Sequence, residues 1–181
     1  MKKYAFSGGL LINGTGSAPV ENSLVLVEGD KIVYAGTDKE ISADYELVNI
    51  SGKTIMPGLI DTHLHFSGNL TDDDSEWVLE DRVQKTVVAV QQAHECLENG
   101  LTTVGEISYS GLAIRNMIEQ KVMQGPRVVG TGLGFCRTCG HGDSHKLPSW
   151  YNDQSHPWAE RVDGPWDLRK AVRRRLRENP D

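Results

Sequence analysis

The feature that most constrains the fold is a change of rhythm near residue 55, after which short apolar runs alternate with amphipathic stretches. Residues 54–66, 101–107 and 127–135 are rich in β-branched and aliphatic side chains, which is typical of strands. The stretches that follow them repeat apolar residues at spacings of three and four, which predicts helices. Alternating strands and helices predict an α/β fold with a parallel sheet and right-handed crossovers.

Three helices are predicted from this periodicity. The first begins from N-cap candidates in 72–75 and ends at Gly100, where glycine favours helix termination. The second spans 111–124, and the third starts at Pro165. The face predicted to be buried on the first helix comprises Leu79, Val83, Val87, Val90, His94 and Leu97, and on the third it comprises Leu168, Val172 and Leu176.

The first 54 residues follow a different pattern, of short strands joined by turns. Residues 9–14, 23–28 and 31–36 are β-rich, and Gly29 favours a hairpin because glycine accepts a positive φ. So small a sheet buries little by itself and should pack on a larger body. We therefore predict a small β domain at 1–54 and an α/β domain at 55–181.

Composition narrows the classes of function. The net charge of −6 argues against a nucleic-acid surface, and the arginines after residue 168 are predicted to form a solvated helix face. No apolar run approaches the roughly 18 residues of a membrane span, and glycines interrupt the N-terminal stretch that would otherwise suggest a signal peptide. Three cysteines do not suggest a disulfide scaffold, so we expect a cytoplasmic protein without a membrane partner.

The pattern Asp61-Thr-His63-Leu-His65 carries the chemistry. It lies at the carboxyl end of the first predicted strand of the α/β part. Residues i and i+2 of a strand project to the same side, so both imidazoles can reach one ion, and imidazole is a natural ligand for zinc. Taken alone, the pair is equally well explained as two unconnected polar residues.

The surroundings of this pair change the interpretation. The run from Met56 to His65, preceded by a small β domain, resembles the amidohydrolase superfamily, and in particular its imidazolonepropionase-related and metal-dependent dipeptidase or carboxypeptidase branches. Further segments on both sides of this run are similar to segments of that branch and occur in the same order as they do there. They extend over nearly the whole chain and are 9–16, 27–32, 99–104, 125–128 and 139–143.

The resemblance implies a (β/α)8 TIM-like barrel that carries one or two divalent metal ions, zinc in the first place. A small β-sandwich domain, of which 1–54 would be the N-terminal part, would be built from both chain ends. His63 and His65 would be ligands of the more buried metal, and Asp61 would hydrogen-bond at the strand end rather than bind the ion. The ion would activate water and polarise the scissile carbonyl.

The same pattern requires residues that this sequence lacks. A carboxylated lysine on the fourth strand, histidines on the fifth and sixth, and an aspartate on the eighth that also acts as general base are expected beyond residue 181. We therefore predict only the first three β/α units and no catalytic residue in this chain, which alone should be inactive. Its expected partners are the remainder of its own chain, further copies in a homo-oligomer, and a small amide or peptide substrate.

His141 follows the third predicted strand, in Gly140-His-Gly-Asp143. The resemblance places such a histidine beside the substrate, where it would hydrogen-bond a carbonyl or carboxylate; the alternative is a residue that only shapes the turn. Alternatively, Cys136, Cys139 and His141 could form a zinc site with His145 as the fourth ligand, but two ordinary thiols explain the pattern better.

The rest of the expected active face is less specific. Glu106 ends the second strand and is interpreted as a structural carboxylate with satisfied hydrogen bonds. The alternative is that it supports the metal ligands without binding the ion itself. Gly105 stands where relatives often have an arginine. The long loop after the third strand could form a lid over the substrate, a subunit contact, or both. It carries the polar and aromatic side chains His145, Trp150, Tyr151, His156 and Trp158.

These observations predict a metal-dependent hydrolase that cleaves an amide C–N bond, in a dipeptide or an N-acyl amino acid. Deamination or the opening of a cyclic amide on the same scaffold is the first alternative. The second is a non-catalytic fragment or degenerate barrel that acts in binding or assembly.

Overall fold

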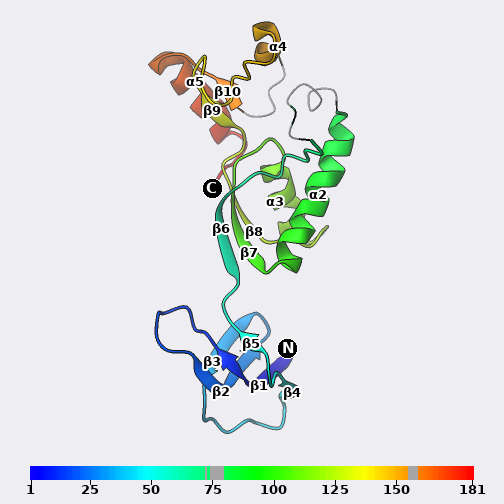
Figure 1. Ribbon diagram of the computed structural model, residues 1–181, viewed down its shortest axis with the longest axis vertical. Helices are drawn as coiled ribbons and strands as arrows, with labels where there is room; N and C mark the ends of the chain where they lie inside the picture. The colour runs from blue at the N-terminus through cyan, green and yellow to red at the C-terminus, as the bar shows by residue number, and fades with distance from the viewer. Residues whose placement is uncertain (72, 74–79, 155–158) are drawn as a thin grey trace. The chain divides into compact units, whose positions relative to one another are not determined.

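The structure is a computed structural model that describes residues 1–71, 73, 80–154 and 159–181 (Figure 1). It consists of two compact units, Met1–Pro57 and Gly58–Asp181. Some residues used in the sequence predictions lie outside the described residues. These are Leu79, His156 and Trp158, together with all of the N-cap candidates in 72–75 except Asp73.

The first unit is built around one five-stranded sheet. Its order is β3-β2-β1-β4, and β5 pairs with β1 as well. β1 runs antiparallel to β2, as β2 does to β3, whereas β4 and β5 lie parallel to β1. The strands are β1 (Lys3–Leu11), β2 (Val20–Glu28), β3 (Lys31–Gly36), β4 (Glu46–Asn49) and β5 (Thr54–Ile55).

Local sequence explains this sheet. Gly29, with φ +60°, forms the turn between β2 and β3, as predicted. One face of the sheet buries Ala5, Leu24 and Leu26, against which Tyr34, Ile41 and Tyr45 pack. The segment predicted at 9–14 is the end of a longer strand, because β1 already begins at Lys3. A second layer that would make the unit a sandwich remains a prediction.

The second unit contains a parallel sheet in the order β6-β7-β8, formed by Leu59–Leu64, Leu101–Glu106 and Arg127–Gly130. Helix α2 (Arg82–Glu98) connects β6 to β7, and α3 (Gly111–Glu119) connects β7 to β8. Figure 1 shows both helices beside this sheet. The predicted alternation of strands and helices and the parallel pairing are therefore present in this unit.

The core of the second unit lies between the sheet and the two helices. It contains Phe66 after β6, Val104, Val128, and residues of α2 and α3. The buried residues of α2 are Ala89, Ala93 and Cys96, not the predicted stripe.

Of the described residues in the predicted stripe, Val90 and Leu97 are half-buried and the others are exposed. Val83 and Val87 are 71% and 64% exposed, and His94 is exposed rather than packed. Small side chains on the sheet side let the helix approach β7 closely, so the periodic valines lie on another face. Periodicity located the helix but selected the wrong face.

The helix ends also differ from prediction. The carboxylate of Asp81 caps α2 by accepting the N–H groups of Val83 and Gln84 at 2.8 and 3.3 Å. Helix α3 ends at Glu119, with Gln120 as its C-cap, short of the predicted residue 124, because Lys121 has a φ of +59°, which no α-helix continues.

The strand predicted at 127–135 is divided in two. Gly132, with φ +70°, separates β8 from β9 (Gly134–Cys136), and β9 pairs in parallel with β10 (Ala159–Arg161) as a separate two-stranded sheet. Along the chain, the short helix α4 (Ser149–Gln154) comes after β9 and before β10.

Helix α5 (Pro165–Leu176) begins at the predicted proline but has a different buried side. Ala171 is buried, whereas Leu168, Val172 and Leu176 are exposed, so the predicted inward stripe was wrong. The side chain of Arg175 lies on the covered side instead, over the ring of Phe135. Within the described residues, no helix has the length and apolarity that crossing a bilayer requires.

The buried face of α2 gives a matched pair of substitutions. Ala93→Leu should lower the free energy of unfolding by about 1–3 kcal/mol, because added methyl groups cannot fit between α2 and the sheet. Val87→Leu, on the exposed face, should change it by less than about 0.5 kcal/mol. Urea unfolding followed by circular dichroism measures both, and equal effects would contradict the observed orientation of the helix.

A second prediction concerns acid stability of the first unit. The Tyr45 hydroxyl donates to the Glu28 carboxylate at 2.5 Å, and Lys3 Nζ lies 3.1 Å from it; these two contacts lower the pKa of Glu28 below its usual 4.5. A lowered pKa contributes stability above pH 4.5 that is lost as the pH falls through the folded-state value. In Tyr45→Phe, the unfolding free energy should therefore fall less steeply with pH below about 4.5. Thermal unfolding between pH 3 and pH 6 tests this, with Tyr4→Phe as the control.

Candidate functional site

His63 and His65 lie at the carboxyl end of β6. Leu64 between them packs against the core on the helix side, so the two histidines project to the other face of the sheet. Their rings meet edge to face, with 4.9 Å between centroids and an interplanar angle of 87°. His63 is exposed and His65 half-buried. The i, i+2 spacing therefore brings the two imidazoles together.

Backbone groups orient this pair. The N–H of His63 donates to the Asp61 carboxylate at 3.0 Å, so Asp61 shapes the strand end. Nδ1 of His65 lies 2.6 Å from the carbonyl oxygen of Ile107, just after β7. A carbonyl only accepts, so Nδ1 carries the proton and the lone pair of the ring is on Nε2. This is the arrangement in which a neighbouring carbonyl fixes the tautomer of a metal-binding histidine.

Glu106 ties the ends of β6 and β7 together. Its side chain is fully buried and accepts the N–H groups of Phe66 at 3.0 Å and Ser108 at 3.2 Å. Burial raises the pKa of Glu106, and the hydrogen bonds from Ser108 and Phe66 act in the opposite direction. The Phe66 carbonyl in turn accepts the hydroxyls of Ser108 and Ser110. Glu106 is thus a satisfied carboxylate that acts on the backbone next to His65.

Two adjacent imidazoles, of which His65 has its tautomer fixed by Ile107, fit the first two positions of a divalent metal site. A zinc site needs at least one further protein ligand. Among the described residues, no group of three or more histidine, cysteine, aspartate or glutamate side chains is arranged to hold an ion. The same finding covers Cys136 and Cys139: the first is half-buried, and burial raises the pKa of its thiol, while the second is exposed.

His141 lies on the turn that follows β9. Its side chain is exposed, whereas the neighbouring Gly142 and Asp143 are buried. Asp143 Oδ1 pairs with Nη1 of Arg161, on β10, at 3.2 Å. The pair formed by His63 and His65 belongs to the loop end of another strand, and the structure does not join His141 to it by a described contact.

The sequence did not reveal that Arg161 pairs with this turn. It lies 18 residues from Asp143, in a segment for which no strand was predicted. The run Ala159-Glu-Arg-Val162 carried one weak signal, an apolar residue at each end of an extended stretch. No periodicity, however, predicts which carboxylate a distant arginine will pair with.

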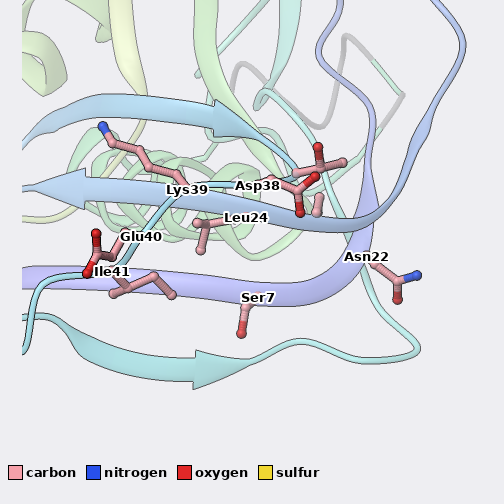
Figure 2. Close-up of a pocket in the computed structure, with 9 residues that line it drawn as sticks. Ser7, Asn22, Leu24, Asp38, Lys39, Glu40 and Ile41 are labelled. Carbon is pink, nitrogen blue, oxygen red and sulfur yellow. The ribbon is translucent and has the colours of Figure 1, made fainter.

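The depression in Figure 2 is a separate feature of the first unit. It lies beside β1 and β2 and is open to solvent. Its lining contains no histidine or cysteine, and consists of Ser7, Asn22, Ser23, Leu24, Thr37, Asp38, Lys39, Glu40 and Ile41. It offers no arrangement for the predicted hydrolysis.

Comparison with known sequences gives a family match and relatives. The sequence profile of the Amidohydrolase family matches residues 54–181. Ochratoxinase from Aspergillus niger is 27% identical over 186 residues, covering 93% of this chain and 38% of that protein. A 5-methylthioadenosine/S-adenosylhomocysteine deaminase from Symbiobacterium thermophilum is 30% identical over 151 residues, which are 74% of this chain and 34% of the deaminase.

Solved structures are similar over 99% of this chain. The crystal structure of A. niger ochratoxinase superimposes with a TM-score of 0.83 at 24% identity and is covered to 45%. A Xaa-Pro dipeptidase with methionine bound in its active site gives a TM-score of 0.80 at 26% identity and is covered to 46%. The chain thus has the mixed α/β fold of the matching part of these proteins, and it spans less than half of their length.

The buried carboxylate gives a test of the site's framework. Glu106→Gln should lower the free energy of unfolding by about 1–3 kcal/mol, because an amide offers one acceptor where two backbone N–H groups need partners. Glu119→Gln makes the same change at an exposed position of α3 and should be nearly neutral. Chemical denaturation compares the two, and a loss in Glu106→Gln no larger than in the control would show that the junction does not depend on the carboxylate.

Proposed function

This chain belongs to the amidohydrolase family, and from that premise we propose that it supplies His63 and His65 as two metal ligands of a metal-dependent hydrolase. The proposed reaction is hydrolysis of an amide C–N bond in a dipeptide or an N-acyl amino acid. The observation that carries the proposal is the convergence of the two imidazoles, 4.9 Å apart at the end of β6. Active sites of parallel α/β proteins assemble at such carboxyl ends.

Contacts among the described residues support this proposal. Ile107 fixes the tautomer of His65, and Asp61 holds the backbone at His63. Glu106 joins the backbone of Phe66, just after the end of β6, to the end of β7. A divalent ion, zinc in the first place, would supply Lewis acidity and an activated water when bound.

We propose that His141 binds the substrate through a carbonyl or carboxylate oxygen. The support is its position: an exposed imidazole on a turn whose other polar side chain, Asp143, is buried and paired. One structural relative is a Xaa-Pro dipeptidase, whose name indicates a substrate with an amide and a free carboxylate. The remaining ligands and the general base would come from sequence that the longer relatives have in addition.

Deamination on the same scaffold is the second candidate. The observation that favours it is the 30% identity to the Symbiobacterium deaminase over 74% of this chain. Dipeptides and N-acyl amino acids, tested beside aminated purines and cyclic ureas, separate the candidates. Turnover of the ring compounds alone would replace the amide-hydrolysis proposal with this one.

The metal ligands are tested in the full-length protein by elemental analysis and kinetics. His63→Ala and His65→Ala should each reduce the bound divalent metal and lower kcat/KM by at least about 100-fold, since each removes a ligand. His94→Ala is the matched control, because His94 is an exposed histidine on α2. A wild-type protein without divalent metal, whose properties neither chelator nor His63→Ala alters, would instead support a non-catalytic role.

A further inference from the structure

The turn that carries His141 is closed by its own hydrogen bonds. Gly140 N–H donates to the Arg137 carbonyl at 2.8 Å, and Asp143 N–H donates to the Gly140 carbonyl at 3.0 Å. The N–H of Cys139 donates to the Asp143 carboxylate at 2.8 Å. The turn therefore sets one exposed imidazole next to a buried carboxylate that accepts from the turn's own backbone.

β10 and the residues that follow it contact this turn and its surroundings at several points. Nη1 of Arg161 lies 3.2 Å from Asp143 Oδ1, and the two side chains are only 15% and 11% exposed. The same Nη1 is 3.4 Å from the hydroxyl of Ser149, the first residue of α4. Asp163 accepts the N–H and the hydroxyl of Thr138 at 3.0 and 2.6 Å. One short segment thus contacts the beginning, the middle and the far end of the loop.

Close packing limits the turn as well. A side chain at Gly142 would place its Cβ 2.5 Å from the Cβ of Ala159 and 3.2 Å from the Sγ of Cys136. The residue after His141 therefore lies directly against β9 and β10. The turn has no room to move toward these strands, and its hydrogen bonds to Asp143 and Thr138 oppose movement away from them.

The charge pair joins the turn to β10 through two side chains that are both largely buried. A buried charge pair tolerates few other geometries, because the favourable interaction of the two charges is needed to offset the cost of removing them from water. Removal of the guanidinium would take away the contact between Asp143 and β10. The turn would then be held less firmly against the strand.

We infer that Arg161 and Asp143 are positioning residues, which fix the turn so that His141 meets the carbonyl or carboxylate end of the substrate. The inference rests on the proposed function, in which His141 is the residue that contacts the substrate. It adds that the affinity for that end of the substrate depends on a charge pair between the turn and β10. Neither partner needs to touch the substrate itself.

Amide hydrogen exchange in the full-length protein tests the positioning directly. In Arg161→Gln, the amides of 139–143 should exchange at least about tenfold faster than in the wild type, because the turn opens more often. Arg161→Lys, which keeps the charge but loses the planar fork, should fall between the two. Arg173→Gln, an exposed arginine of α5, is the control and should exchange as the wild type does. Unchanged exchange at 139–143 in Arg161→Gln would overturn the inference.

Steady-state kinetics with an N-acyl amino acid then separates the two proposals. His141→Ala and Arg161→Gln should each raise KM about tenfold while kcat changes less than about twofold, and the double variant should be no worse than either. If His141→Ala leaves KM unchanged, the proposed substrate contact is wrong and the inference falls with it. If His141→Ala raises KM but Arg161→Gln does not, the positioning inference alone is wrong.

Discussion

The candidate site depends on one buried carboxylate. Glu106 accepts backbone N–H groups from Phe66 and Ser108, and so joins the ends of two neighbouring parallel strands. A buried carboxylate without partners would be strongly destabilising, so these two hydrogen bonds and the position of Glu106 require one another. The consequence for the site is local: Phe66 follows His65, and Ile107, which binds the ring of His65, follows Glu106.

The turn around His141 repeats this arrangement with other groups. There the buried carboxylate is Asp143, which accepts the N–H of Cys139 and pairs with Arg161. In both places a histidine lies close to a buried carboxylate, and that carboxylate accepts hydrogen bonds from backbone N–H groups. Such an acid makes the adjacent backbone rigid, and a rigid backbone restricts the positions that the imidazole can take.

The sequence predicted what local patterns determine. Alternating strand and helix segments located β6, β7 and their helices, Gly29 located the hairpin, and the spacing of His63 and His65 placed the two rings on one side of the strand. Such local patterns did not predict which faces of the elements are buried or which distant side chains pair. Whether α2 buries its valines or its alanines depends on how closely the sheet approaches, and the partner of Asp143 is set by a strand that begins 16 residues later. The break between β8 and β9 likewise depends on a pairing partner, β10, that no local pattern marks.

The junction between β6 and β7 also orders events in folding. The contact between His65 and Ile107 spans 42 residues of sequence, and that between Phe66 and Glu106 spans 40. Contacts of such separation form only after a long loop has closed, whereas the turn between β2 and β3 closes within a few residues. The orientation of the His65 ring is therefore acquired late, when the parallel strands have already paired. A nascent chain would have both histidines long before it has the geometry to use them.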